Sequence, residues 1–198
     1  MKYIIVAITA YLLGSYCASI PITRKFYGDD VRNHGSGNAG ATNVARVYGL
    51  KAGLLTLACD MAKTVAAMLV GRALCGVEGE ALAGAICITA HCFPLYFGFR
   101  GGKGVSVGAA LGLMCGWKVF ASILAVFFAV AFLSRKVSLG SICASASLPV
   151  FAAVFGADTA LWLMCIYSAA LVIVMHRSNI KRLIAGEEGN FKPQRGRK

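Results

Sequence analysis

Long apolar segments, separated by short polar or glycine-rich stretches, occupy most of this 198-residue chain. A membrane-spanning helix needs about 20 apolar residues, because about 30 Å of hydrocarbon is crossed at about 1.5 Å per residue. The pattern therefore predicts spanning helices at residues 3–22, 50–74, 81–99, 137–155 and 159–175. The polar stretch at residues 23–49 is predicted to be a loop.

Residues 104–133 form one further apolar stretch, which would be about 45 Å long as a single helix. That length exceeds one span unless the helix is strongly tilted. Gly116, Trp117 and Lys118 lie near its middle, and a Trp and a Lys suit a turn at the membrane interface. We therefore predict a short fourth helix and a fifth helix here, which brings the number of spans to seven.

The distribution of positive charge supports seven spans. The chain has 20 Lys and Arg against 8 Asp and Glu, a net charge of +12. With seven spans most basic residues fall on one side of the membrane, whereas with six spans Arg135 and Lys136 are separated from the basic C-terminal tail. Cytoplasmic loops carry the excess of Lys and Arg. The prediction is an all-α integral membrane protein with seven transmembrane helices, the N-terminus outside and the C-terminus cytoplasmic.

Composition excludes several other classes of protein. The chain is 58% hydrophobic and 14% charged, whereas a soluble domain is about 45–50% apolar and about 25% charged. Its basic residues form short clusters between apolar runs rather than one soluble face, so we expect no nucleic acid partner. The eight cysteines lie in or beside apolar runs without a C-x-x-C pair, which argues against a zinc site or a disulfide framework. We expect neither a metal nor a cofactor.

The first glycine-rich stretch, residues 34–43, reads His-Gly-Ser-Gly-Asn-Ala-Gly-Ala-Thr-Asn. Gly35, Gly37 and Gly40 match G-x-G-x-x-G, but the dinucleotide-binding form of this motif follows a buried strand. The preceding residues 29–34, Asp-Asp-Val-Arg-Asn-His, predict no such strand. We therefore exclude a dinucleotide site here.

The same stretch still suits an anion. Glycines let backbone N–H groups approach a phosphate closely, and the N-terminus of a following helix attracts negative charge. Arg46 lies one turn further along the chain and supplies a positive charge. The neutral donors in the stretch are Ser36, Asn38, Thr42 and Asn43. We predict a phosphate site, with an ordinary flexible loop as the alternative.

A second glycine-rich stretch, residues 97–104, reads Phe-Gly-Phe-Arg-Gly-Gly-Lys-Gly. It is not a Walker A motif, because Phe97 stands where Gly is required and Gly104 stands where Ser or Thr should follow Lys103. A Gly-Gly-Lys-Gly turn that opens a helix still suits an anion. It predicts a second anion site on the same side of the membrane, with a plain basic membrane anchor as the alternative.

Two polar pairs lie one helical turn apart near predicted cytoplasmic helix ends. Ser138 and Ser141 lie near the start of the sixth helix, and His176 and Asn179 share a face at the end of the seventh. Both pairs are candidates for the functional site. The structural alternatives are that Ser138 is a helix N-cap and that His176 is a favourable partner for a helix dipole.

Charged and titratable residues also occur inside predicted spans. Asp60 and Lys63 lie in the second span and His91 lies in the third. Such groups are costly in a membrane unless they have a partner or face water. They predict either a self-neutralising structural pair with a core histidine, or groups that face a common cavity.

Taken together, these motifs resemble the bacterial membrane glycerol-3-phosphate acyltransferases that use an acyl-phosphate donor. The resemblance is carried by Gly14-Ser15, Ile20-Pro21, residues 35–43, Arg46, Asp60, Lys63, His91-x-Phe93-Pro94, Gly101-Gly102-Lys103-Gly104, Ser138-x-x-Ser141 and His176-x-x-Asn179. The chain departs from the family at Ala90 and Thr64, where glycine is usual, and these departures bear on packing rather than on chemistry.

The resemblance implies a seven-helix enzyme of the bacterial cytoplasmic (inner) membrane, with its active site facing the cytoplasm. It implies acyl transfer from acyl phosphate to the 1-hydroxyl of glycerol 3-phosphate, giving lysophosphatidate and phosphate among the membrane lipids. Residues 1–186 would form a single seven-helix transmembrane catalytic domain, and residues 187–198 a basic, flexible cytoplasmic tail. The oligomeric state is left open, and a monomer is compatible with the sequence.

The resemblance also implies roles for individual residues. Those expected to contact the glycerol phosphate and the donor phosphate are Ser36, Arg46, Lys103, Ser141, His176 and Asn179. To these we add Asn38, and we assign catalysis to Asn38, Lys103 and His176. Further substrate-binding residues are Gly37, Gly101, Gly102 and Gly104, with support from Asp60, Lys63, His91 and Ser138. The alternatives are a transporter of phosphate or phosphoesters, and an acyltransferase that uses acyl-CoA.

Overall fold

The computed structural model describes residues 1–190, and every regular element in that part of the chain is a helix. The α-helices are α1 (Lys2–Ser15), α2 (Ser19–Tyr27), α3 (Ala41–Tyr48), α4 (Leu50–Cys92), α5 (Val105–Cys115), α6 (Trp117–Ser134), α7 (Val137–Val154), α8 (Thr159–Met175) and α9 (Arg177–Ile184). Two short 3-10 helices are η1 (Val31–Asn33) and η2 (Leu95–Phe97). The predicted all-α class is confirmed.

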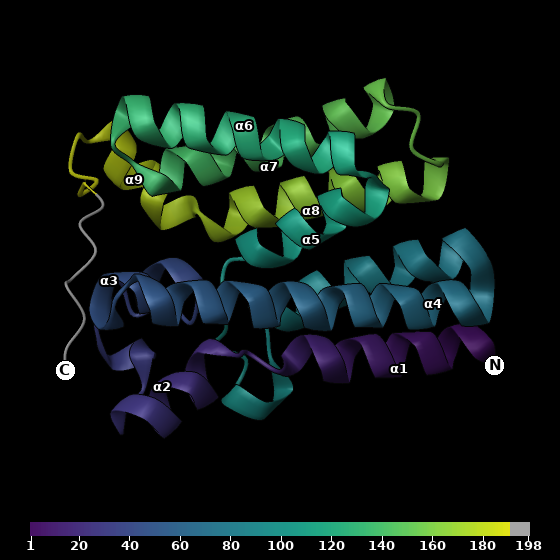
Figure 1. The fold of residues 1–198 in the computed structure, drawn as a ribbon, viewed down its shortest axis with the longest axis horizontal. Coiled ribbons are helices and arrows are strands. Elements are labelled where there is room, and N and C mark those ends of the chain that lie inside the picture. The colour runs from purple at the N-terminus through teal and green to yellow at the C-terminus, as the bar shows by residue number, and fades with distance from the viewer. Residues whose placement is uncertain (191–198) are drawn as a thin grey trace.

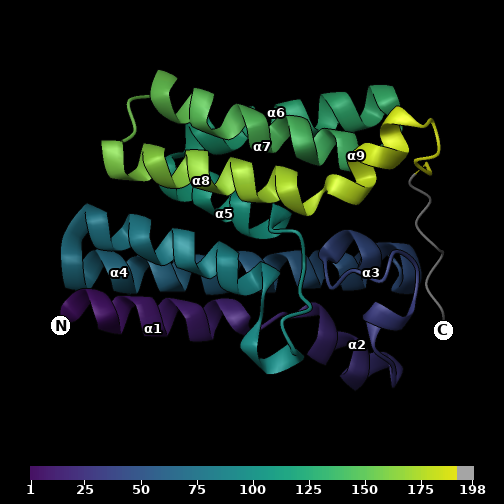
Figure 2. The ribbon, with the colours of Figure 1, turned by 180° about the vertical axis from the view of Figure 1, so that it is seen from behind.

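The long helices lie side by side in two layers (Figures 1 and 2). Helix α1 packs along α4 in one layer, and α5 to α8 form the other. Buried apolar side chains from α1 and from α4 to α8 form the core where the layers meet. The short helices α2, α3 and α9 gather toward one end of the molecule, and the N-terminus lies at the opposite end (Figure 1). The end that holds α2, α3 and α9 therefore brings together segments from the beginning and the end of the chain.

Helix α4 is a hairpin of two antiparallel arms rather than one straight rod (Figure 1). Cys75 (φ −140°, ψ 20°) and Gly76 (φ 64°, ψ −154°) leave the helical region and reverse the chain. Glycine adopts the positive φ at position 76 without steric cost. Beside the turn, Gly71 and Gly79 approach so closely that a Cβ on either would collide with the backbone of the other. Small residues thus allow the two arms to touch along their backbones.

Large apolar side chains stay exposed along the long helices, as contact with lipid requires. Phe132 and Leu133 of α6 are 84% and 82% exposed, and Val154 of α7 is 68% exposed. Within residues 1–190, four helices are long and apolar enough to cross a membrane, or five if the bent pair α8 and α9 is one span. This count takes α1 with α2 as one segment and α4 as one segment. The first arm of α4 covers the span predicted at residues 50–74, and the second arm covers only part of the span predicted at residues 81–99.

The predicted break near the middle of residues 104–133 is confirmed. Helix α5 ends at Cys115 and α6 begins at Trp117, with Gly116 between them at φ 136°. With 11 residues, α5 is shorter than a helix that crosses about 30 Å of hydrocarbon by itself.

Three predicted boundaries are wrong. The segment at residues 3–22 is not one helix, because α1 ends at Ser15 and α2 begins at Ser19. The segment at residues 81–99 leaves its helix after Cys92, just before Pro94 (φ −76°, ψ 129°), which cannot supply a helical N–H. The stretch at residues 23–49 is not only loop, since it holds the end of α2, η1 and α3.

Candidate active site

The first glycine-rich loop is held in shape by the side chain of Asn43. The Asn43 amide nitrogen donates to the carbonyl oxygens of Val31 (3.1 Å), His34 (3.0 Å) and Asn38 (3.0 Å). Its amide oxygen accepts the backbone N–H of Ser36 at 2.9 Å. Asn43 was expected to donate a hydrogen bond to an anion, but its amide group binds the backbone of the loop instead.

Two glycines allow the loop to take this path. Gly35 and Gly37 have φ of 59° and 69°, in the left-handed region that favours glycine. A Cβ at Gly35 would also collide with the amide oxygen of Asn43. The loop ends at Gly40, which precedes α3, so that the loop leads into the N-terminus of that helix. Arg46 of α3 lies 3.4 Å from the Asn43 amide oxygen.

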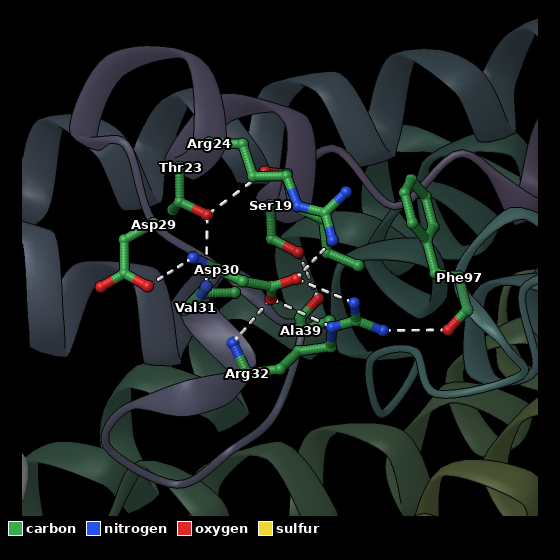
Figure 3. A network of polar contacts seen from close by, with 10 residues as sticks. Ser19, Thr23, Arg24, Asp29, Asp30, Val31, Arg32, Ala39 and Phe97 are labelled. Carbon is green, nitrogen blue, oxygen red and sulfur yellow. Dashed lines mark hydrogen bonds and ion pairs between the residues drawn. The ribbon is translucent and has the colours of Figure 1, made fainter.

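An ion-pair network anchors the segment in front of this loop (Figure 3). The carboxylate of Asp30 accepts hydrogen bonds from Arg24 (2.9 Å) and from two nitrogens of Arg32 (2.8 and 3.0 Å). Arg32 also donates to the carbonyl of Phe97 at 2.9 Å, and Ser19 donates to the carbonyl of Ala39 at 2.8 Å. The network was not expected from the sequence, because its partners lie as far apart as residues 32 and 97. It fastens the segment that precedes the first glycine-rich loop to Phe97, at the start of the second.

The second glycine-rich loop presents Lys103 toward the other side of the site. The Lys103 ammonium donates to the amide oxygen of Asn179, which lies in α9. Gly104 adopts φ 83° and precedes the first residue of α5, so Lys103 sits at the entrance to that helix. A residue of the second glycine-rich loop and a residue of α9 are thus brought together.

Several cations surround Lys103. Burial, together with the nearby charges of Arg182, Arg46 and Arg177, lowers the pKa of Lys103 to about 8, against the opposing charge of Glu188. Like charges are costly when they are this close, and an anion that binds among them relieves their repulsion. The arrangement is therefore suited to phosphate groups.

His176 lies at a bend rather than on a continuous helix. Helix α8 ends at Met175 and α9 begins at Arg177, with an angle of 59° between them. The prediction that His176 and Asn179 share the face of one helix is therefore wrong. The reason is local: His176 has φ −93° and ψ 8°, and its Nδ1 lies 2.8 Å from the carbonyl of Val172. That contact leaves Nε2 as the ring atom available to a ligand.

Glu188 is the residue of this region that sequence reasoning missed. Its carboxylate accepts hydrogen bonds from Ser138 (2.6 Å), Asn179 (2.7 Å) and Arg182 (2.7 Å), and its backbone carbonyl accepts one from Lys136. Burial alone would raise the pKa of Glu188, but these hydrogen bonds lower it below its usual range. A signal was present in the sequence, because Glu187 and Glu188 are the only acidic residues after Asp158. The start of the predicted flexible tail is therefore anchored, and residues 191–198 of that tail lie outside the described residues.

The other predicted side chains with polar contacts lie in two places, one near Ser138 and one inside α4. Ser141 is 3% exposed and donates to the carbonyl of Val137 at 3.0 Å, one turn from Ser138. Asp60, Lys63 and His91 form a separate buried cluster inside α4. Within residues 1–190, no group of three or more His, Cys, Asp or Glu side chains is placed to hold a metal ion.

Comparison with known proteins identifies the family. The sequence profile of the glycerol-3-phosphate acyltransferases matches residues 4–186. The chain belongs to the glycerol-3-phosphate acyltransferase family. The resemblance drawn from the motifs is thus confirmed.

Relatives and solved structures agree with this membership. The glycerol-3-phosphate acyltransferase of Thermoanaerobacter sp. (strain X514) is 39% identical over 191 residues, covering 96% of each chain. That of Clostridioides difficile (strain 630) is 41% identical over 202 residues, covering 94% of each chain. The crystal structure of PlsY (YgiH), an integral membrane glycerol 3-phosphate acyltransferase in its glycerol 3-phosphate form, superposes with a TM-score of 0.91 at 36% identity. Its coverage is 97% of this chain and 96% of the other. The lysophosphatidic acid form of PlsY gives a TM-score of 0.89 at 33% identity, with the same coverage. The protein is accordingly a multi-pass membrane protein of this family.

Proposed function

We propose that this protein transfers a fatty acyl group from acyl phosphate to the 1-hydroxyl of glycerol 3-phosphate, giving lysophosphatidate and inorganic phosphate. The observation that carries the proposal is the meeting of Lys103 with Asn179, among the charges of Arg46, Arg177 and Arg182. Both substrates and both products bear phosphate, so a site for this reaction has to accommodate two anions together. The family of this chain and the names of its relatives support the same reaction.

The chemistry needs no nucleophile from the protein. Acyl phosphate is a mixed anhydride, so the 1-hydroxyl oxygen of glycerol 3-phosphate attacks its carbonyl carbon directly. The carbonyl carbon gains a bond to that oxygen and loses its bond to the phosphate oxygen, and phosphate leaves with the bonding electrons. The proton of the hydroxyl passes to a substrate phosphate oxygen or to Nε2 of His176. Catalysis then depends on bringing the two anions together and on stabilising the developing oxyanion.

We assign the residues to these tasks as follows. Lys103 and Asn38 stabilise the oxyanion and the leaving phosphate, and His176 is the residue of the chain that can take the proton of the hydroxyl. The residues that hold the phosphate groups are Ser36, Gly37, Arg46, Gly101, Gly102, Gly104, Ser141 and Asn179. Ser138 supports the site through Glu188, to which it donates a hydrogen bond.

The donor is tested by an acyl-transfer assay on the purified protein in detergent or a lipidic phase. Glycerol 3-phosphate is supplied with palmitoyl phosphate or with palmitoyl-CoA, and released phosphate and lysophosphatidate are measured. We expect product from the phosphate donor alone. Product from the thioester alone would keep the acyltransferase and overturn the donor. No product from either donor, with glycerol 3-phosphate still bound, would favour a transporter.

Replacing Arg46 by alanine is expected to raise the KM for glycerol 3-phosphate by about 10- to 100-fold, the loss of one charge-assisted contact. Steady-state kinetics at a saturating concentration of acyl phosphate measure this change. Lys51 provides a matched control, since it is exposed at the start of α4 on the same side of the molecule. Equal KM values for the Arg46→Ala and Lys51→Ala variants would contradict the assignment of Arg46.

The lowered pKa of Lys103 predicts the alkaline side of the pH profile. A lysine with a pKa of about 8 is protonated below that pH and loses its charge as the pH rises through it. We therefore expect kcat/KM, which reports the free enzyme, to fall above about pH 8. The Lys103→Arg variant keeps its charge throughout this range, so its residual activity is expected to stay level there. A wild-type kcat/KM that holds level to pH 10 would contradict the role of the Lys103 charge.

We also propose the topology of the chain. The seven spans are α1 with α2, the two arms of α4, α5 together with the loop that leads into it, α6, α7 and α8, with the N-terminus outside and the C-terminus cytoplasmic. Residues 1–186 then form one catalytic domain of the bacterial cytoplasmic membrane, with its site facing the cytoplasm. An odd number of spans is consistent with Figure 1, where the N-terminus and α9 lie at opposite ends. A fluorescent protein fused to the C-terminus is expected to fluoresce, and an alkaline phosphatase in the same place is expected to be inactive. The opposite pair of results would overturn the orientation.

A further inference from the structure

A buried polar cluster lies next to the second glycine-rich loop. Asp60 and Lys63 lie one turn apart on the first arm of α4, and His91 lies on the second arm. The three residues are 0%, 8% and 1% exposed. Charges in an apolar interior are retained only where partners compensate their loss of hydration. The contacts of each group therefore indicate what the cluster does.

Lys63 explains how α1 ends. Its ammonium lies 3.0 Å from the carbonyl oxygen of Gly14 and 2.6 Å from that of Tyr16, at the C-terminal end of α1. Terminal carbonyls of a helix lack partners within the helix, and a cation there is favourable. The carboxylate of Asp60, 3.1 Å from the ammonium, neutralises its charge. Lys63 and Asp60 are thus explained by the packing of α1 against α4.

His91 is not explained in this way. Its Nδ1 lies 3.0 Å from the Lys63 ammonium, which can only donate. Nδ1 therefore accepts, the ring is neutral and its proton is on Nε2. A protonated ring would place two cations 3.0 Å apart in the interior. Lys63 accordingly fixes both the tautomer and the orientation of the imidazole.

The opposite edge of the ring contacts Gly102. A Cβ at Gly102 would collide with Nε2 of His91 and would lie 3.0 and 3.1 Å from Cε1 and Cδ2. The backbone N–H of Gly102 donates to the carbonyl of His91 at 3.1 Å, and that of Gly101 donates to the carbonyl of Cys92 at 3.3 Å. Gly101 and Gly102, which precede Lys103, are thus attached to the end of α4 by two hydrogen bonds, and Gly102 packs against the imidazole.

We propose that His91, oriented by Lys63, is a positioning residue whose imidazole sets the place of Gly102 and thereby the place of the Lys103 ammonium. The inference rests on the proposed function, because it concerns the placement of a group in that same site. His91 acts through the loop and takes no part in the chemistry. Such placement matters to the rate, since a shift of about 1 Å in a reacting group costs about 100-fold.

The test is a double-mutant cycle on His91 and Gly102. His91→Asn keeps an oxygen near the position of Nδ1 for Lys63 and removes the ring edge that Gly102 contacts. We expect its kcat to fall by about 10- to 100-fold, with its thermal unfolding temperature in detergent close to that of the wild type. Gly102→Ala alone is expected to lose at least about 100-fold in kcat/KM, because its Cβ collides with the ring. In the double variant the methyl group occupies vacated space, and activity should recover by about 10-fold over Gly102→Ala.

Two further variants separate positioning from general packing. Gly108→Ala, in α5, is the matched control, since its Cβ would meet only the Ser168 hydroxyl at 3.8 Å. We expect it to keep wild-type kinetics. His91→Gln carries an amide toward the position of Nε2 and is expected to retain more of the wild-type kcat than His91→Asn. The reverse order would contradict the proposal, and so would wild-type kcat and KM in His91→Asn.

The double-mutant cycle distinguishes a failure of the positioning role from a failure of the proposed function. A double variant whose loss equals the product of the two single losses would overturn the contact between His91 and Gly102 as the basis of the effect. A wild-type protein that turns over neither acyl donor would contradict the proposed function instead. In that event, equilibrium binding of radiolabelled glycerol 3-phosphate to the same variants replaces the kinetics. Recovery of binding in the double variant supports the positioning role, and its absence contradicts it.

Discussion

Replacing Lys103 by alanine is expected to lower the turnover of acyl transfer by about 1,000-fold, which corresponds to about 4 kcal/mol of transition-state stabilisation. Lys103 is the one member of the two glycine-rich loops that carries a charge into the contact with Asn179. In the proposed mechanism, its removal takes away the cation that stabilises the developing oxyanion and the departing phosphate. The initial rate of phosphate release from palmitoyl phosphate, with glycerol 3-phosphate in excess, measures the effect.

Two variants make this expectation specific. Cys165→Ala removes a buried side chain of α8 whose one described polar contact is with Cys115, at 3.5 Å. It should leave turnover nearly intact. Lys103→Arg keeps the charge but changes its shape and reach, so we expect intermediate activity. Equal rates for Lys103→Ala and Cys165→Ala would overturn the site.

Replacing Glu188 by alanine is the second change with a large expected effect. The substitution leaves Ser138, Asn179 and Arg182 without the acceptor that joins them. A hydrogen bond to a charged group contributes about 1.5–3 kcal/mol, and three such bonds to the carboxylate are lost together. The loss also reaches Lys103 through Asn179. We expect the unfolding temperature in detergent to fall by several degrees and the turnover to fall by about 100-fold.

The neighbouring residue gives the control. Glu187 is exposed, so Glu187→Ala removes the same charge from the same segment without touching the network. It should behave as the wild type. Glu188→Gln keeps an acceptor but loses the charge, and we expect an intermediate result. A Glu188→Ala variant as stable and active as Glu187→Ala would show that the network is dispensable.

The network also has a defined pH dependence. The pKa of Glu188 is lowered in the folded protein, because hydrogen bonds from Ser138, Asn179 and Arg182 outweigh the effect of burial. A carboxylate of this kind stabilises the fold at pH values above its ordinary pKa. Its contribution is lost as the pH falls through the lowered value. Acid should therefore narrow the difference in stability between the wild type and Glu188→Ala.

The class of the protein and the motifs of its site could be predicted from the sequence because both depend on local properties. A segment long and apolar enough to cross a membrane is visible as a run of residues, and Gly116 interrupts such a run where the structure turns. Glycines that must adopt positive φ or face a close neighbour, such as Gly35 and Gly104, stand out by their spacing. Lys103 and Asn179 could be named for the same reason, since each belongs to a short motif.

The helix boundaries were harder to predict, because contacts from elsewhere in the chain decide them. The break after Ser15 follows from the Lys63 ammonium, which binds the carbonyls of Gly14 and Tyr16 across 49 and 47 residues of sequence. The bend at His176 likewise has no proline or glycine to announce it. Apolar composition continues through the first of these breaks, so the hydrophobic pattern alone predicts one helix.

By itself, the sequence determined that this protein is all-helical, lies in a membrane and carries two glycine-rich loops suited to phosphate. These properties follow from the composition of contiguous segments, because each depends on residues that are close together in the sequence. Only the tertiary structure decided which polar groups hydrogen-bond within the protein and which remain available to a ligand. Asn43 holds its own loop, His91 contacts Gly102, and Glu188 binds three residues at the end of the bundle. The physical reason is that a hydrogen bond satisfies a side chain only when its partner is in place, and the partners of Glu188 come from segments as far apart as residues 138 and 182.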